Sequence, residues 1–288
     1  MEYIFFLSEL RKKKIDSNMN KFNISFYLDD KLEKSHLDFY KDNGFIVFRN
    51  FLSPQHVESI LHEISRIEKQ LLKDGTQKIN GVPLKFGKNA DGEISIQRIC
   101  FSSLYSDILK KVVGDNRLLL LKDFLSPFDA RINEHEKDGL VLNNYIRTQG
   151  SSFSKMGWHT DCPRDIFLGQ RIMPMLNIGI HLDDCLAENG GLRVLPGTHK
   201  QGVFKMLFGK KYFIDNDDDR REVGFDINKG DLSVHCGRLW HRVKESPLYG
   251  IESIRRVMYI PMITGKESPK NKFSKTPFYH RISSKIKI

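Results

Sequence analysis

The chain has 288 residues, enough for one large domain with a sizeable core, and 40% of its residues are hydrophobic against 28% charged. No apolar run reaches the length of a membrane helix, and the N-terminal MEYIFFLSELRKKK lacks the basic start and the small-residue cleavage site of a secretion signal. The formal net charge of +10 is spread over scattered basic residues, so nucleic acid is not the expected partner.

The cysteines indicate the compartment. They are widely spaced and form neither a C-x-x-C pair nor a compact disulfide framework, which is typical of proteins kept in a reducing environment. We therefore expect a globular protein of the cytoplasm that makes no use of a membrane. The four residues are Cys100, Cys162, Cys185 and Cys236.

The N-terminal half predicts helices. A short helix is expected over residues 34–43 and a strand over 44–50, followed by a helix with Ser53 as its N-cap and Pro54 as its first residue. Apolar residues then recur at helical spacing, so one face of this helix should brace a sheet. These residues are Val57, Ile60, Leu61, Ile64, Ile67 and Leu71.

A further helix is predicted over residues 102–114, with Gly114 as its stop. After about residue 117, short segments rich in branched and aromatic residues alternate with turn residues, as in LVLNNYIRT, MLNIGIHL, GLRVLPG, GDLSVHC and RRVMYIPMI. This pattern predicts a mainly β fold, an antiparallel sandwich or barrel that carries helices on its N-terminal side. We expect an N-terminal extension over 1–33, one domain over 34–265 and a basic tail over 266–288.

The stretch GWHTD suggests a metal site. In an extended segment His159 and Asp161 leave the same face, and His235 or His241 in GDLSVHCGRLWHRV could supply a third ligand. Two histidines and one carboxylate leave coordination positions open, the arrangement of ferrous oxygenases, whereas a structural zinc site needs four protein ligands. A second H-x-D pair, His181 and Asp183, satisfies the same spacing, so spacing alone does not choose between them.

The order of six segments along the chain decides between the two H-x-D pairs. FYKDNGFIVFRNFLS, IQRICFSSLYSDILKKVVG, GWHTD, NGGLRVLPGTHKQG, GDLSVHCGRLWHRV and RRVMYIPM resemble, in this order over about residues 34–263, the phytanoyl-CoA dioxygenase family of iron(II)- and 2-oxoglutarate-dependent oxygenases. The resemblance implies a double-stranded β-helix, or jelly roll. It also implies that His159, Asp161 and His241 hold Fe(II), with 2-oxoglutarate and dioxygen as co-substrates.

The resemblance further implies hydroxylation of an unactivated C–H bond in a small metabolite, with release of succinate and carbon dioxide. Related halogenases replace the carboxylate ligand by a small residue, so the presence of Asp161 favours hydroxylation. Arg255 is expected to bind the remote carboxylate of 2-oxoglutarate, with Arg256 as the alternative, because the two point to opposite faces of one strand. Asn144 resembles a family position that touches the co-substrate. Two residues after the distal histidine, where many relatives have a serine that helps to hold the co-substrate carboxylate, this chain has Val243.

Two other functions remain open from the sequence: a nucleic-acid-directed oxygenase that uses the basic tail, and a jelly-roll binding protein without catalysis. The substrate is expected to be a small molecule, with an anionic group if Arg147, Lys155 or Arg164 lines the mouth of the site. The run DNDDDRRE over residues 215–222 is expected to be a solvated loop or a lid. The oligomeric state is not indicated.

Overall fold

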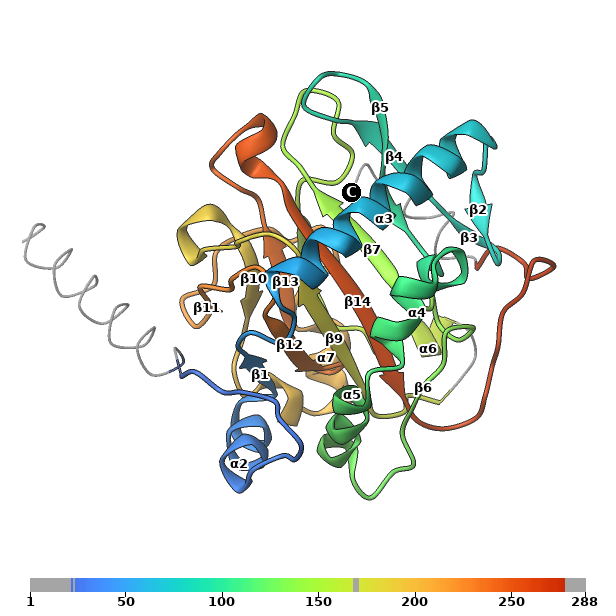
Figure 1. Cartoon of the computed structure of the whole chain (residues 1–288). Helices are drawn as coiled ribbons and strands as arrows, with labels where there is room; N and C mark the ends of the chain where they lie inside the picture. Colours follow the sequence, from blue (N-terminus) through green and yellow to red (C-terminus); the bar gives the residue numbers. More distant parts are fainter. Residues whose placement is uncertain (1–21, 23, 168–170, 278–288) are drawn as a thin grey trace, which may run out of the picture.

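The computed structural model describes residues 22, 24–167 and 171–277, and its strands form two facing antiparallel sheets (Figure 1). The larger sheet contains, in order across its width, β1 (Phe45–Phe48), β12 (Leu232–Cys236), β9 (Met175–His181), β14 (Arg255–Ile263), β7 (Val141–Tyr145), β5 (Ile94–Ile99) and β4 (Lys85–Lys88), with β6 (Arg131–Ile132) paired to β14. The smaller sheet contains β11 (Val223–Gly224), β10 (Gly191–Val194), β13 (His241–Lys244) and β8 (Met156–His159). The predicted jelly-roll architecture is confirmed, and the sheets are not closed into a barrel.

The remaining elements are short except for one helix. A separate hairpin pairs β2 (Lys78–Ile79) with β3 (Val82–Pro83). The α-helices are α2 (Lys34–Asn43), α3 (Pro54–Lys73), α4 (Asp107–Val113), α5 (Asn116–Leu120), α6 (Pro163–Phe167) and α7 (Val203–Phe208). The 3-10 helices are η1 (Ser102–Tyr105), η2 (Leu121–Leu125), η3 (Ala187–Asn189), η4 (Thr198–Lys200) and η5 (Gly250–Ser253).

Helix α3 covers the outer face of the larger sheet. It begins as predicted, because the Ser53 hydroxyl accepts a hydrogen bond from the His56 N–H at 3.3 Å and Pro54 occupies the first turn. Its buried apolar side chains belong to the same cluster as Leu142, Ile180 and other outer-face residues of β7 and β9, which α3 crosses in Figure 1. The inner face of this sheet is thereby left for the interior between the two sheets.

The helix predicted over residues 102–114 is divided in two. Ser106 adopts an extended backbone conformation between η1 and α4, and its hydroxyl accepts the Leu109 N–H at 3.3 Å. A serine competes with the helix for backbone hydrogen bonds and is more stable as a cap than in a helix interior. The predicted stop at Gly114 is confirmed.

The ends of the described chain are attached to the domain. Leu28 is buried in the main core, and the backbone N–H groups of Ser268 and Lys270 donate to Glu136 and to the carbonyl of His135. Residues 1–21 and 23 of the expected N-terminal extension and residues 278–288 of the basic tail lie outside the described residues, and the domain boundaries stay a prediction. Within the described ranges, no helix combines the length and the apolar composition needed to cross a bilayer.

Candidate metal centre

Two histidines face the interior from neighbouring strands of the smaller sheet. His159 ends β8 and His241 begins β13, and they are direct partners in the antiparallel register, so their side chains leave the same face. Their ring centroids are 4.1 Å apart and both side chains are buried. Each Nδ1 lies within 3.0 Å of the carbonyl two residues earlier in the chain, Gly157 for His159 and Leu239 for His241. Donation from Nδ1 to these carbonyls leaves each Nε2 lone pair for a metal.

Asp161 completes a three-sided cluster. Its backbone N–H donates to the carbonyl of Gly237 at 2.8 Å, which fixes the chain just after β8, and its Oδ1 lies 3.9 Å from His241 Nε2. One ligand atom from each of His159, Asp161 and His241 lies within 4.8 Å of the other two. In the part of the chain that the structure describes, no other group of three metal-binding side chains meets this criterion.

The charge states in the cluster suit a divalent metal. Burial, together with the neighbouring imidazoles, keeps the pKa of His241 well below its usual value, and burial likewise lowers the pKa of His159. Burial would raise the pKa of Asp161, but His241, His235 and His159 together lower it well below its usual range. Near neutral pH the cluster therefore offers two neutral nitrogen donors and one carboxylate, the protonation states that metal binding requires.

His235, the other candidate for the third ligand, comes from the opposite sheet. It lies on β12, with its Nε2 3.4 Å from Asp161 Oδ2 and its ring centroid 4.2 Å from that of His241. Its nitrogens do not belong to the compact cluster. The geometry therefore favours His241 as the third ligand and leaves His235 beside the carboxylate.

The second H-x-D pair has a structural role. His181 is buried on β9 with its Nε2 3.0 Å from the Ser233 hydroxyl. Asp183 accepts two hydrogen bonds from the Arg256 guanidinium, at 2.6 and 2.8 Å. The two side chains are thus engaged with different partners and do not form a metal site.

His181 should make the protein sensitive to mild acid. Burial lowers the pKa of His181 from 6.5 to about 4 in the folded protein, so below pH 6.5 the unfolded chain binds more protons and stability falls with pH down to about 4. Between pH 7 and pH 5 the wild type should lose about 2 kcal/mol more unfolding free energy than His181→Gln, which keeps a polar atom facing Ser233. Urea titrations at both pH values measure the difference, and equal losses would contradict this role.

Strand alternation separates the two arginines. Arg255 pairs with Tyr145 on the inner face and is buried, with Nη1 donating to the Lys244 carbonyl at 2.7 Å and Nη2 to the Ser154 carbonyl at 3.1 Å. In the described part of the chain its Nε has no hydrogen-bond partner. Arg256 lies on the outer face, paired with Asp183 as above. The buried guanidinium available to an interior carboxylate is therefore that of Arg255.

The register corrects the expected role of Asn144. Asn144 is the strand partner of Arg256, so it shares the outer face and points away from the metal cluster. Its neighbour Asn143 faces inward and donates from Nδ2 to the Tyr145 hydroxyl at 3.2 Å, while its buried Oδ1 has no hydrogen-bond partner among the described residues. The pattern VLNNY contains two adjacent asparagines, and the resemblance to the family selected the one that faces outward.

Apolar and aromatic residues surround Val243, which occupies the position where many relatives have a serine. Val243 packs with Tyr145, Phe153 and Met156 in one buried cluster. Burial raises the pKa of Tyr145 strongly, and the guanidinium carbon of Arg255 lies 5.9 Å from the centroid of the Tyr145 ring. Tyr145 therefore brings a hydroxyl-bearing ring of this cluster beside Arg255.

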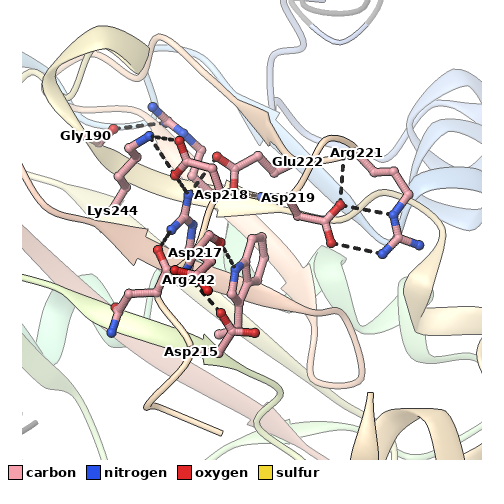
Figure 2. A network of polar contacts seen from close by, with 12 residues as sticks. Gly190, Asp215, Asp217, Asp218, Asp219, Arg221, Glu222, Arg242 and Lys244 are labelled. Atoms are coloured by element: carbon pink, nitrogen blue, oxygen red, sulfur yellow. Dashed lines mark hydrogen bonds and ion pairs between the residues drawn. The ribbon is translucent and has the colours of Figure 1, made fainter. Parts of the chain in front are cut away.

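The acidic run over residues 215–222 is not a free loop. It packs on the outer face of the smaller sheet, where the buried Arg242 guanidinium donates to Asp218 at 2.5 Å and to Glu222 at 2.7 Å (Figure 2). Arg242 also lies over the Trp158 ring, 5.0 Å from its centroid, and the indole N–H donates to the Asp217 carbonyl at 2.9 Å. The run is a largely exposed loop, as expected, but these contacts anchor it to the outer face of β8 and β13, so it does not act as a lid over the site.

The start of this run and the residues just before it lie beside the metal cluster. Phe213 and Asp215 form backbone hydrogen bonds with Trp158 along the free edge of β8, at 2.9 and 2.8 Å. This places the Phe213 ring on the His159 ring, with 4.7 Å between centroids and 27° between planes. No sequence pattern indicated this contact, because Phe213 and His159 are brought together only by the path of the loop.

The other basic candidates for the mouth are engaged elsewhere. Arg147 donates to the carbonyls of Ser246 and Pro247, and Lys155 lies 3.8 Å from Glu245. Both line a surface hollow of about 340 Å³. The side chain of Arg164 lies outside what the structure describes.

Comparisons with known proteins agree with this geometry. The profile of the phytanoyl-CoA dioxygenase (PhyH) family matches residues 40–245. A probable alpha-ketoglutarate-dependent hypophosphite dioxygenase of Stutzerimonas stutzeri is 27% identical over 166 residues, which are 57% of this chain and 53% of that protein. An uncharacterized protein of Saccharomyces cerevisiae is 25% identical over 75% of this chain and 61% of its own length. The chain thus spans little more than half the length of these relatives.

Several solved structures share the fold. AviO1 from Streptomyces viridochromogenes superposes with a TM-score of 0.56 at 18% identity, covering 84% of this chain and 100% of that one. The epimerase SnoN from nogalamycin biosynthesis, in complex with Fe3+, alpha ketoglutarate and nogalamycin RO, gives 0.57 at 14% identity over 81% and 84%. HygX from Streptomyces hygroscopicus, with nickel and 2-oxoglutarate bound, gives 0.55 at 15% identity over 85% and 89%.

Proposed function

The chain belongs to the phytanoyl-CoA dioxygenase family, and from this premise we propose that it is an Fe(II)- and 2-oxoglutarate-dependent dioxygenase that hydroxylates an unactivated C–H bond of a small molecule. The observation that carries the proposal is the buried cluster of His159, Asp161 and His241. Its two nitrogens and one carboxylate suit ferrous iron and leave positions open for co-substrates. The intact cluster also disfavours a jelly-roll binding protein that has lost catalysis.

The residues have distinct tasks in this proposal. His159, Asp161 and His241 hold the metal, and Arg255 receives the remote carboxylate of 2-oxoglutarate through its planar guanidinium. The Tyr145 hydroxyl is placed to take over from the serine that Val243 replaces. Phe213 shields one face of His159 from water. Bound iron supplies the chemistry in which substrate, 2-oxoglutarate and O2 become hydroxylated product, succinate and carbon dioxide.

Two basic side chains lie side by side on the inner face of the larger sheet. Lys85 of β4 and Arg98 of β5 are strand partners, and Arg98 is in turn the partner of Asn143, so all three share the inner face of the larger sheet. Burial, with a smaller contribution from Arg98, lowers the pKa of Lys85 to about 8. Arg98 is paired with Asp138 at 2.9 Å, so the support for an anionic substrate comes from the similarity to a probable hypophosphite dioxygenase. We propose that the substrate carries a carboxylate or an oxyanion of phosphorus and approaches Lys85 on this face.

The state of the cysteines supports the proposal that the enzyme is cytoplasmic. All four cysteines are free thiols in the structure. Free thiols persist in a reducing environment, and we therefore place the enzyme in the cytoplasm.

Succinate formation tests the proposed function. Purified protein with Fe(II), ascorbate, 2-oxoglutarate and O2 is incubated with single small anions, including hypophosphite, short carboxylates and phosphonates, and succinate is measured with and without each. We expect one class of anion to raise succinate formation above the background without substrate. For that anion, Lys85→Met should raise KM about tenfold or more through loss of one charged contact, whereas Lys88→Met on the exposed end of β4 should not. Stimulation by neutral compounds alone, or equal KM values for both variants, would contradict an anionic substrate.

A further inference from the structure

His235 is a buried imidazole directed at the metal cluster from the opposite sheet. Its side chain is 1% exposed, and its strand partners on β1 and β9 are Phe45 and Asn177. Its Nε2 lies 3.4 Å from Oδ2 of Asp161, whereas Oδ1 is the oxygen that lies 3.9 Å from His241 Nε2. The two oxygens of one carboxylate thus face different neighbours.

The imidazole of His235 approaches the carboxylate of Asp161 without a well-formed hydrogen bond. Among the described residues, neither of its ring nitrogens makes a hydrogen bond of good geometry. A buried imidazole always carries at least one N–H, and leaving that group without an acceptor is unfavourable. Oδ2 of Asp161 is at the long end of hydrogen-bond distance, so a small rotation of either side chain forms the bond.

A second donor approaches the same oxygen. Nδ2 of Asn177 donates to Oδ2 of Asp161 at 3.4 Å. Asn177 and His235 are direct partners on β9 and β12, so both donors project from one place on the inner face of the larger sheet. The larger sheet, which lies opposite the metal-binding histidines, therefore presents a pair of N–H groups to Oδ2 of Asp161.

We propose that His235 is a positioning residue that, with Asn177, holds Oδ2 of Asp161 so that only Oδ1 binds iron. This inference rests on the proposed function. A carboxylate free to turn can bind a metal through both oxygens and occupy a further position. Two-point chelation by 2-oxoglutarate and binding of O2 together need three positions, so a carboxylate held to one oxygen keeps the site competent. Partners of this kind orient metal ligands in other metalloproteins.

A direct ligand role for His235 fits the geometry less well. Its nitrogens fall outside the group of ligand atoms that lie within 4.8 Å of one another. A fourth protein ligand would also leave only two positions on a six-coordinate metal, too few for the co-substrates. If His235 only positions Asp161, a substitution that keeps an N–H donor in place of the imidazole should preserve metal binding. If His235 is a ligand, the same substitution should abolish metal binding.

The test uses His235→Phe, which removes the donor, and His235→Gln, which keeps an N–H near the place of Nε2. Anaerobic titration with Co(II) gives metal affinity and, from the intensity of its visible bands, coordination number; Fe(II) with 2-oxoglutarate gives the charge-transfer band. We expect His235→Phe to weaken metal binding roughly 10–100-fold, to alter the Co(II) spectrum and to weaken the charge-transfer band, and His235→Gln to restore most of each. Asn177→Ala should change them in the same direction by less.

The remaining outcomes overturn the inference. His235→Phe with wild-type affinity and spectra would show that the imidazole does not position Asp161. Equal and complete loss of metal by both His235 variants, with folding intact by circular dichroism, would make His235 a ligand. If His235→Phe does not fold, the Asn177→Ala variant tests the inference in its place. Spectra of Asn177→Ala that match those of the wild type would reject the arrangement of two donors on Oδ2 of Asp161. A wild type that binds no metal or 2-oxoglutarate refutes the proposed function itself, and it is measured before the variants.

Discussion

Arg255→Met is expected to raise the KM for 2-oxoglutarate about 100-fold or more and to leave metal affinity within about threefold of wild type. The buried guanidinium is the cation that faces the interior near Tyr145, and its Nε has no hydrogen-bond partner among the described residues. Two hydrogen bonds to a carboxylate, each of about 1.5–3 kcal/mol, account for a change of this size. Initial rates of succinate formation over a range of 2-oxoglutarate concentrations measure it.

Arg256→Met is the matched control for this prediction. Arg256 is the next residue of the same strand but lies on the outer face, where it binds Asp183. Its removal should lower stability by about 1–3 kcal/mol and leave the KM for 2-oxoglutarate unchanged. If Arg256→Met raised this KM and Arg255→Met did not, the assignment of the two faces would be wrong.

Asp161→Ala is expected to reduce succinate formation by more than about a thousandfold and to abolish stable Fe(II) binding. Loss of residues that only orient a ligand typically reduces affinity or activity 10–100-fold, and loss of the ligand itself should exceed that. The substitution also leaves His159 and His241 without the charged partner that balances a divalent metal. Equilibrium dialysis with Fe(II) under anaerobic conditions and the succinate assay measure the two effects.

Asp183→Ala tests whether the other H-x-D pair has any part in catalysis. Its carboxylate accepts the Arg256 guanidinium and the Arg256 backbone N–H, so its loss should destabilise the fold but keep metal binding. Iron binding that is lost with Asp183 and retained with Asp161 would reject the site described above.

The helices and strands that could be predicted are those with a clear period or a local signal. The apolar spacing of α3 and its Ser53-Pro54 start fixed one helix, and the alternating β9 and β14 segments fixed two strands. The helix expected over residues 102–114 was only partly right, because Ser106 is equally suited to a cap. Local patterns do not decide between a residue that continues a helix and one that begins the next.

The site was predictable where alternation applied and not where the fold brings distant segments together. Alternation indicated that only one of Arg255 and Arg256 faces inward, and the resemblance to the family favoured Arg255 and His241. The sequence offered His235 as an alternative third ligand, but it did not indicate that His235 would approach Asp161 from the opposite sheet or that Phe213 would stack on His159. The error at Asn144 has a different origin, since a strand with adjacent asparagines does not reveal which of the two faces inward.

Anaerobic addition of 2-oxoglutarate to the Fe(II)-loaded protein tests the central claim most directly. We predict a weak visible charge-transfer band, which marks two-point chelation of 2-oxoglutarate by iron, in the wild type and in Asp183→Ala, and no band in Asp161→Ala or His241→Ala. The absence of the band from the wild type, with or without bound iron, would contradict the claim. With iron bound, it would mean that Val243 or the position of the arginine has disabled the co-substrate pocket, and that the protein uses its jelly roll to bind and not to oxidise. Without iron bound, it would mean that His159, Asp161 and His241 do not form a metal site.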